Sequence, residues 1–274
     1  MSLRQAFTDF GLDPAAVGSA ARRPAELVGY LEAHIEQGPL LEAADRSLGY
    51  VTTIAGARRF RLAVVGEARH AGGTPWPRRR DALVGAGEAV VAVERLARAG
   101  DCIATVGRME VRPGAVNVIP GRADFTLDLR AATDGQRDAM WTAIHAELEA
   151  ICTRRGLTLE VTETHRAAAA PCAPWLQQAV VAGIRATDDA GAAEPMALWS
   201  PAGHDAMAVA AVTDVGMLFV RCADGISHSP DEDVREVDVA RGLDALEAAV
   251  LHVAAAVSSG AVSARVGSDS VVPR

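Results

Sequence analysis

The stretch ADFTLDLR (residues 123–130) alternates apolar and polar side chains and so predicts a β-strand that buries one face. Around it, periodicity and turn signals divide residues 58–165 into six elements. In chain order these are a strand near 58–64, a helix at 81–99, strands near 102–111 and 121–129, a helix at 134–155 and a strand at 157–164. The order β-α-β-β-α-β is that of a ferredoxin-like domain. We therefore predict a compact domain over residues 58–165, inserted into a second unit.

The flanking residues 1–57 and 166–257 are expected to form that second unit as an open α/β layer. Apolar spacing predicts helices at 24–37, at 175–186, from 204 and at 238–257, and strands at 196–199 and 215–220. The last helix is expected to bury a stripe of four apolar residues, Leu243, Leu246, Val250 and Val253. Residues 258–274 are small and polar, which predicts a disordered tail.

Composition excludes several classes of function. All 27 basic residues are arginines, so chemistry that needs a lysine, such as Schiff-base formation, pyridoxal phosphate anchoring or a P-loop, is excluded. The 35 acidic residues give a net charge of −8, which argues against a nucleic-acid partner. A chain that is half hydrophobic and 23% charged is typical of a folded globular protein.

The cysteines are too far apart to suggest a zinc ribbon, a redox pair or a disulfide framework; they are Cys102, Cys152, Cys172 and Cys222. We expect reduced, buried thiols. A secretory leader and an 18-residue apolar run are not recognised, so we expect a cytoplasmic protein without a membrane partner.

Four of the seven histidines lie beside turns or element ends, where rigid scaffolds present reactive side chains; they are His34, His70, His204 and His228. His228 follows the strand at 215–220 by a short loop, the usual position of an α/β active site. The remaining histidines are interpreted as structural or surface residues. Taken singly, any of the four also fits an ordinary structural role.

Asn117 is the only asparagine in the chain and precedes the strand that ends in Asp128-Leu129-Arg130. An amide and a guanidinium at neighbouring strand ends could bind a carboxylate, which arginine does bidentately. A turn amide and a surface arginine remain the alternative interpretation.

A series of ordered motifs resembles the M20-type amidohydrolases of the hydantoinase/carbamoylase branch. The motifs are HIEQGP (34–39), HAGGTP (70–75), RDA (80–82), VRPGAVNVIPG (111–121), LDLR (127–130), AGHDA (202–206) and GISHSP (225–230). They occur in the family's order and extend over nearly the whole chain. The branch includes N-carbamoyl-L-amino acid amidohydrolases, allantoate amidohydrolases and β-ureidopropionases. Its fold is a two-metal, zinc-peptidase-like α/β catalytic domain interrupted by a βαββαβ lid that dimerises.

The resemblance assigns roles to individual residues. It implies that His34 and His228 are ligands of two divalent ions, which could be Zn, Mn, Co or Ni. His70 resembles the lid residue that hydrogen-bonds the developing oxyanion across the dimer. Asn117 and Arg130 resemble the pair that binds the substrate carboxylate, with Gln37 and His204 also lining the pocket; these seven residues are the candidate site. In such an enzyme the two ions share a water and polarise the ureido or amide carbonyl.

In this family the H-x-D motif, the bridging aspartate and the paired glutamates lie upstream of the segment that contains His34. We expect the chain as given to lack them, and so to bind metal poorly and catalyse weakly. The prediction is metal-dependent hydrolysis of a linear C–N bond in N-carbamoyl-L-amino acids or substrates such as allantoate. The alternatives are an M20 peptidase or aminoacylase, and a non-catalytic dimerising remnant. Expected partners are a small substrate with a carboxylate and a second copy of the chain.

Overall fold

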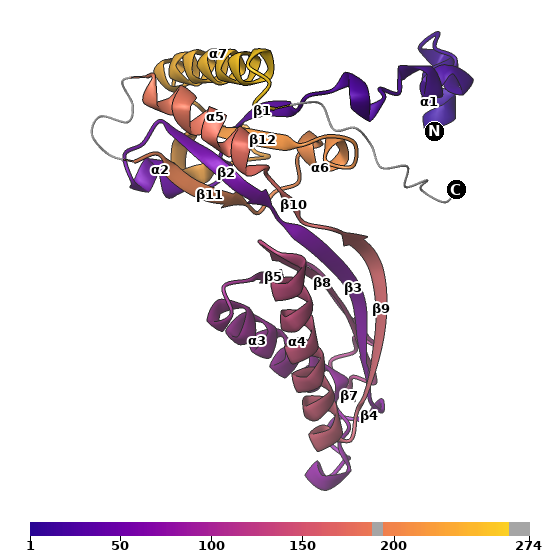
Figure 1. Cartoon of the computed structure of the whole chain (residues 1–274). Coiled ribbons are helices and arrows are strands. Elements are labelled where there is room, and N and C mark those ends of the chain that lie inside the picture. The colour runs from indigo at the N-terminus through magenta and orange to yellow at the C-terminus, as the bar shows by residue number, and fades with distance from the viewer. Residues whose placement is uncertain (188–193, 263–274) are drawn as a thin grey trace.

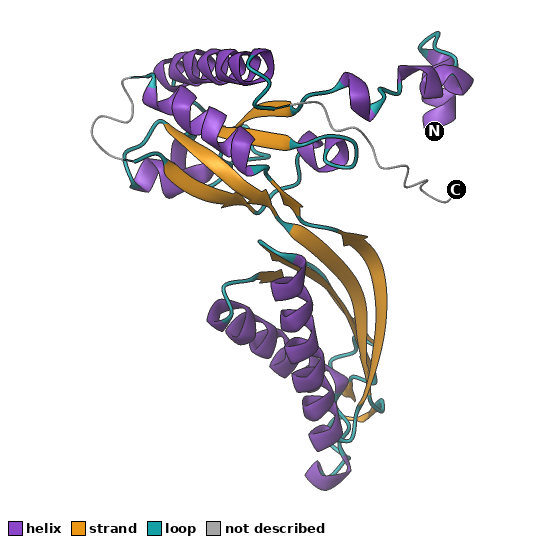
Figure 2. Cartoon of the chain, viewed as in Figure 1, coloured by secondary structure: helices purple, strands orange, loops and turns teal. Residues whose placement is uncertain are grey.

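The computed structural model describes residues 1–187 and 194–262, which form two lobes built on separate sheets (Figure 1). The upper lobe of Figure 1 contains a five-stranded mixed sheet, and the lower lobe contains a five-stranded antiparallel sheet beside a small two-stranded ribbon. Helices cover these sheets (Figure 2). The predicted α/β class is thus confirmed.

The upper sheet is made of β1 (Tyr30–Ile35), β2 (Leu48–Ile54), β10 (Ala170–Pro171), β11 (Met196–Ser200) and β12 (Val215–Val220). Its order is β1-β12-β2-β10, with β11 also paired to β2. Strand β12 runs parallel to β1 and antiparallel to β2, while β11 runs parallel to β2. The carboxyl ends of β1 and β12 therefore meet at one edge of the sheet.

Both faces of the upper sheet are covered. Helices α2 (Leu40–Ala43) and α6 (Asp205–Val209) pack on the face that includes Phe219. Helices α5 (Pro174–Arg185) and α7 (Glu236–Ser258) pack on the face that includes Leu218. Because neighbouring residues of β12 are buried on opposite faces, the strand reads as a continuous apolar run, VGMLFV.

The helix expected at 24–37 is wrong. The segment forms a short 3₁₀ turn, η2 (Pro24–Glu26), followed by strand β1. Tyr30, Leu31 and Ile35 fit helical spacing, but a short apolar segment cannot be assigned by spacing alone. The ladder with β12, which pairs Tyr30 with Val215 and Ile35 with Val220, decides in favour of a strand.

The lower lobe follows the predicted order β-α-β-β-α-β. Its elements are β3 (Gly56–Val65), α3 (Ala82–Ala99), β5 (Ile103–Thr105), β6 (Met109–Arg112), β8 (Arg122–Ala131), α4 (Asp134–Arg155) and β9 (Thr158–Ala167). The sheet order is β5-β8-β3-β9, with β6 also on β8, so the strand expected near 102–111 is broken into two. Short elements β4 (Arg69–His70), η3 (Trp76–Arg78) and β7 (Val118–Ile119) lie at the far end of this lobe.

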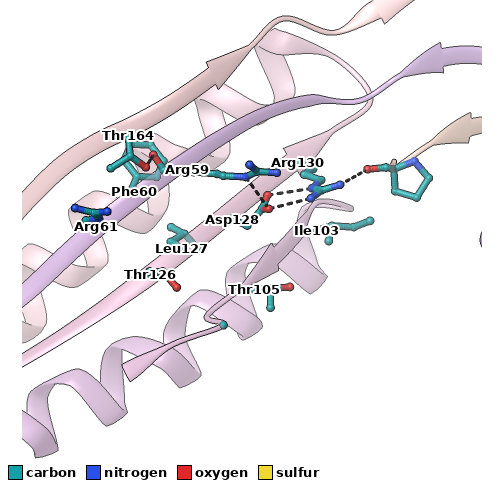
Figure 3. A pocket seen from close by; sticks show the side chains of 12 residues that line it. Arg59, Phe60, Arg61, Ile103, Thr105, Thr126, Leu127, Asp128, Arg130 and Thr164 are labelled. Carbon is teal, nitrogen blue, oxygen red and sulfur yellow. Dashed lines mark hydrogen bonds and ion pairs between the residues drawn. The ribbon is translucent and has the colours of Figure 1, made fainter. Parts of the chain in front are cut away.

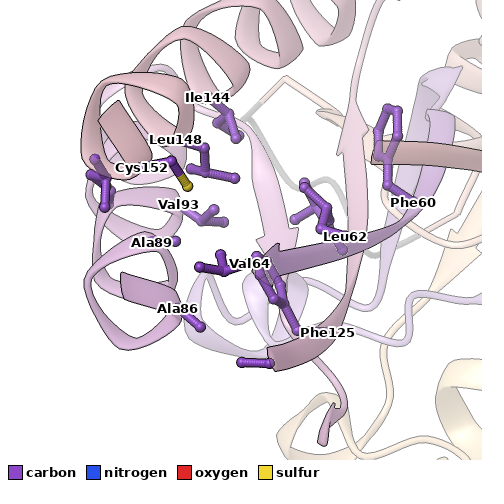
Figure 4. Packing of buried hydrophobic residues seen from close by; sticks show 14 of the residues in the cluster. Phe60, Leu62, Val64, Ala86, Ala89, Val93, Phe125, Ile144, Leu148 and Cys152 are labelled. Carbon is purple, nitrogen blue, oxygen red and sulfur yellow. The ribbon is translucent and has the colours of Figure 1, made fainter. Parts of the chain in front are cut away.

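Helices α3 and α4 cover one face of the lower sheet and enclose a single apolar cluster (Figure 4). Phe60, Leu62 and Val64 of β3 meet Phe125 of β8 and the small residues of α3 in this core. The opposite face of the sheet carries the polar residues of each alternation. The division of the chain into a catalytic part and a lid stays a prediction.

The buried stripe expected on α7 is confirmed only in part: Leu246 packs against the apolar core, but Leu243 and Val250 do not. Leu243 is 63% exposed and Val250 is 50% exposed, whereas Gly242, Ala245 and Ala249 are buried. Small residues face α5 because the two helices approach closely, and Leu243 and Val250 are left exposed.

The remaining elements are α1 (Leu3–Asp9), η1 (Pro14–Ala20) and η4 (Ala223–Gly225). Neither α1 nor η1 contains a buried residue, and both lie on an arm that extends from the upper lobe (Figure 1). Of the tail expected at 258–274, Ser258 ends α7, and residues 263–274 lie outside the described residues. Among the described helices, none combines the length and apolarity that a membrane span requires.

Candidate functional site

Two sequence motifs meet where β1 and β12 end. Gln37 follows β1 in a left-handed conformation (φ 54°), and its side-chain amide donates a hydrogen bond of 2.7 Å to Ser227 Oγ. Ser227 directly precedes His228, so the loop after β12 is tied to the end of β1. The structure thereby brings the HIEQGP and GISHSP motifs together, 190 positions apart in the chain.

Gly225 makes this contact possible. It has φ +67°, and a Cβ built on it would lie 2.5 Å from the carbonyl carbon of Gly38. Cys222 and Asp224 of the same loop also contact the segment after β1, through the Gly38 carbonyl and the Glu42 carboxylate. The two loops are therefore packed backbone to backbone.

His34 lies on β1 with its ring oriented by the backbone. Its Nδ1 is 2.8 Å from the carbonyl oxygen of Ile35, a group that can only accept. Nδ1 therefore carries the proton, and Nε2 keeps a lone pair. Metal-binding histidines are commonly oriented in this way, with one nitrogen donating to a carbonyl and the other on the metal. His34 thus fits the role of a metal ligand.

His204 precedes α6, and its ring is packed edge-on against that of His34, with 4.6 Å between the ring centroids. Its side chain is 1% exposed, and its Nε2 lies 2.6 Å from Ser200 Oγ. Burial, with a smaller contribution from His34, lowers the pKa of His204 to about 4, so the ring is neutral at pH 7. Ser200 Oγ also contacts the backbone N–H and carbonyl of Ala202.

Glu32 is a residue of this site that the sequence did not indicate. Its Oε2 accepts a hydrogen bond of 2.9 Å from the Ala206 N–H in the first turn of α6, and its Oε1 lies 3.6 Å from His204 Nδ1. Positions 32 and 34 of a strand share a face, whereas in a helix they point in different directions. The mistaken helix therefore concealed that Glu32 and His34 lie on the same face of β1.

His228 follows this cluster on an exposed turn. It has a left-handed backbone conformation (φ 58°), and its N–H donates to Glu232 Oε2 at 3.1 Å. Non-glycine residues rarely adopt this conformation, which occurs preferentially at functional turns. Within residues 1–187 and 194–262, however, no three His, Cys, Asp or Glu side chains are placed to hold a metal ion together. His34 fits a metal; a complete ligand set is not assembled by the described residues.

Arg130 lies near the end of β8, where the lobes meet. Its Nε and Nη2 bind the two oxygens of Asp128 at 3.0 and 2.9 Å, and its Nη1 donates to the Pro201 carbonyl at 2.8 Å. Hydrogen bonds from Arg130 and Arg59 outweigh burial and hold the pKa of Asp128 below its ordinary value. These three bonds use only three of the five N–H groups of a guanidinium, so donors remain for a ligand.

His70 lies at the opposite end of the lower lobe, in the β4–β7 ribbon, and Asn117 directly precedes β7. Nδ1 of His70 accepts hydrogen bonds from the N–H groups of Gly72 (3.2 Å) and Gly73 (2.9 Å), so in the neutral ring the proton is on Nε2. An exposed Nε2–H is a donor, as an oxyanion would require. The Asn117 carbonyl accepts from the Ala71 N–H at 2.9 Å.

We expected Asn117 and Arg130 to lie at neighbouring strand ends. Within a single copy of the chain, that expectation is wrong. Asn117 precedes β7 and the start of β8, while Arg130 lies near the end of β8. Eight residues of extended strand span about 27 Å. One copy of the chain therefore does not bring the two side chains to one ligand, nor His70 to His34.

A hollow of about 600 Å³ lies on the open face of the lower sheet, next to Arg130 (Figure 3). It is bounded by Pro201, three residues before His204, and contains the side chains of Arg59, Arg61 and Asp128. The hollow therefore begins at the loop that leads to His204.

Comparison with known proteins gives one consistent result. Residues 11–252 match the model of peptidase family M20/M25/M40. The chain is 39% identical over 247 residues to the N-carbamoyl-L-amino acid amidohydrolase of Geobacillus stearothermophilus, covering 90% of this chain and 59% of that protein. It is 39% identical over 249 residues to the allantoate deiminase of Arabidopsis thaliana, covering 82% of this chain and 47% of that protein.

Solved structures agree. A hydantoinase/carbamoylase family amidase from Burkholderia multivorans superposes with a TM-score of 0.76 at 37% identity, covering 83% of this chain and 55% of the other. One from Burkholderia vietnamiensis gives a TM-score of 0.75 at 34% identity, covering 91% and 59%. The chain thus spans about half to three fifths of the length of the proteins it matches.

Proposed function

The chain belongs to peptidase family M20/M25/M40, and from that premise we propose that it supplies part of a metal-dependent amidohydrolase. The substrate is a linear ureido or amide compound with a carboxylate, such as an N-carbamoyl-L-amino acid or allantoate. The observation that carries the proposal is the convergence of the HIEQGP, AGHDA and GISHSP motifs around His34, together with the identity to N-carbamoyl-L-amino acid amidohydrolase.

His34 and His228 are the ligands that this chain contributes to two divalent ions, which could be Zn, Mn, Co or Ni. When bound, such ions supply a water of lowered pKa and polarise the scissile carbonyl. His34 suits this role because the Ile35 carbonyl fixes its tautomer. His204 and Gln37 line the pocket; each is held in place by a serine hydroxyl.

Arg130 binds the substrate carboxylate, with its orientation fixed by Asp128 and the Pro201 carbonyl. His70 stabilises the developing oxyanion through Nε2–H, and Asn117 contributes to carboxylate binding. Because both lie far from Arg130 within one chain, they act on the site of a second copy. The lower lobe, residues 58–165, is accordingly the lid through which a homodimer forms. Free, buried cysteines support a cytoplasmic location.

The test joins this chain to the amino-terminal region of the Geobacillus relative and assays N-carbamoyl-L-amino acids, allantoate, N-acetyl amino acids and dipeptides with added Mn or Zn. We expect turnover of ureido substrates that is lost in His34→Ala and His228→Ala and retained in His252→Ala, a control on α7. Failure to hydrolyse any ureido compound would refute the proposal. Preference for N-acetyl or dipeptide substrates would favour an aminoacylase or peptidase instead.

A further inference from the structure

More arginines than carboxylates line the hollow on the open face of the lower sheet (Figure 3). Three guanidinium groups, those of Arg59, Arg61 and Arg130, line it together with one carboxylate, that of Asp128. Asp128 is shared between Arg59, at 3.1 Å, and Arg130. The net charge of these four side chains is therefore positive.

Arg61 is the uncompensated member of the group. Other arginines on this face are paired, for example Arg122 with Asp124 and Glu160, and Arg108 with Glu110. Arg61 is exposed, and among the described residues its guanidinium has no hydrogen-bond or ion-pair partner. The hydroxyls of Thr105 and Thr126 border the same hollow and add neutral donors.

The register of the sheet sets the spacing of these groups. Arg130 pairs with Ala57 across β3 and β8, so Arg59 and Arg61 stand two and four residues further along β3. At about 3.3 Å per residue these offsets are roughly 7 and 13 Å. A ligand whose carboxylate is bound by Arg130 could therefore extend along the hollow towards the guanidiniums of Arg59 and Arg61.

We propose that this hollow is a specificity subsite for a second anionic group, so that the preferred substrates are ureido derivatives of acidic amino acids. The proposal rests on the proposed function in one respect: Arg130 takes the first carboxylate. Arg59 and Arg61 then bind the side-chain carboxylate, because a guanidinium offers paired donors that match a carboxylate.

The subsite can be tested by equilibrium binding to this chain, without turnover. N-carbamoyl-L-glutamate and N-carbamoyl-L-glutamine have nearly the same shape and differ by one charge. Calorimetry should show the glutamate derivative binding roughly three- to tenfold more tightly, as expected for a partly exposed charge-assisted pair. Arg61→Gln or Arg59→Gln should reduce this ratio, and Arg61→Lys should retain most of it.

Arg95→Gln is the matched control, since it removes the same charge from α3 and leaves the hollow intact. Circular dichroism would verify that each variant is folded. Equal binding of the two derivatives, or a ratio unchanged in both Arg61→Gln and Arg59→Gln, would overturn the inference. Selective binding without turnover in the joined enzyme would instead count against the proposed function alone.

Discussion

At the scale of single residues, the site depends on side chains whose proton positions are fixed by the backbone. The Ile35 carbonyl fixes His34, and the Gly72 and Gly73 N–H groups fix His70. Neither arrangement requires a charged partner, so each ring in its neutral form presents one defined nitrogen. A lone pair on His34 suits a metal, and an N–H on His70 suits an oxyanion.

Glu32 gives a prediction at this scale. It is the acceptor for the Ala206 N–H, and the residue before α6, His204, makes no capping bond of its own. Glu32→Ala should lower the free energy of unfolding by about 1 kcal/mol, the usual cost of a lost cap. Glu32→Gln keeps an acceptor oxygen and should recover most of that loss. Urea denaturation measures both, with exposed Glu94→Ala as the control; equal stability of all three variants would contradict this role.

Arg130 gives a second prediction, in the joined enzyme. Replacing it with alanine removes the carboxylate donor and leaves Asp128 without its bidentate partner. We expect kcat/KM to fall by an amount equivalent to roughly 2–4 kcal/mol, the range for truncating one member of a buried charge pair. An unchanged kcat/KM would show that the carboxylate binds elsewhere.

At the scale of elements, two positions require a glycine because backbones approach closely there: the contact between the loops after β1 and β12, and the contact between α5 and α7. Gly225→Ala would place a methyl group 2.5 Å from the Gly38 carbonyl carbon and force a left-handed alanine. We expect a loss of about 1–3 kcal/mol in unfolding free energy. Gly18→Ala, which meets no atom within 4 Å, is the control. Equal melting temperatures for the two variants would mean that the packing of the two loops is not tight.

The α5–α7 interface gives the corresponding prediction for helices. A Cβ at Gly183 would lie 2.1 Å from the Ala245 carbonyl oxygen, so Gly183→Ala must separate the helices. We expect destabilisation of about 1–3 kcal/mol from overpacking. Leu243→Ala, on the exposed side of α7, should change stability by less than about 0.5 kcal/mol. If urea denaturation instead showed Leu243→Ala to be more destabilising than Gly183→Ala, Leu243 would be a buried residue, as the sequence pattern predicted.

At the scale of the whole molecule, a cluster of arginines and carboxylates lies in the lower lobe, next to the strands β3 and β9 by which the chain enters and leaves that lobe. Arg137 is 2% exposed; it binds Asp134 at 2.6 Å and the Ala167 carbonyl at 2.8 Å. Arg58 binds Asp138 and Glu163 nearby. The contact that places the hollow against the loop of His204 is the hydrogen bond from Arg130 to the Pro201 carbonyl.

This cluster predicts a defined acid sensitivity. Hydrogen bonds from Arg166 and Arg58 lower the pKa of Glu163 from 4.5 to about 2. A folded-state pKa below the unfolded one means that the stabilisation is complete above about pH 4.5 and is lost as the pH falls towards 2. Glu163→Gln should therefore be less stable than the parent at pH 7, and the difference should disappear near pH 2. Urea midpoints across this range test it, with Glu94→Gln as control; a difference independent of pH would exclude the ion pair as its source.

Local patterns in the sequence predicted the lower lobe and the candidate residues. Helix α4 begins and ends where its periodicity and Gly156 predicted, and β12 has the predicted bounds, because capping residues and short apolar runs are local signals. The motifs also identified His34, Gln37, His204 and His228, which lie on or beside the ends of neighbouring elements.

That Tyr30–Ile35 is a strand follows from the folded structure alone, because its partner β12 lies about 185 positions later in the chain. That pairing places Glu32 beside His34 and His204, which no spacing rule could show. The tertiary structure also separates Asn117 from Arg130 by the length of β8. On α7 it buries Gly242, Ala245 and Ala249 and leaves Leu243 and Val250 exposed. In each case the outcome depends on contacts between distant segments, whose free energy exceeds the local preferences that a sequence pattern records.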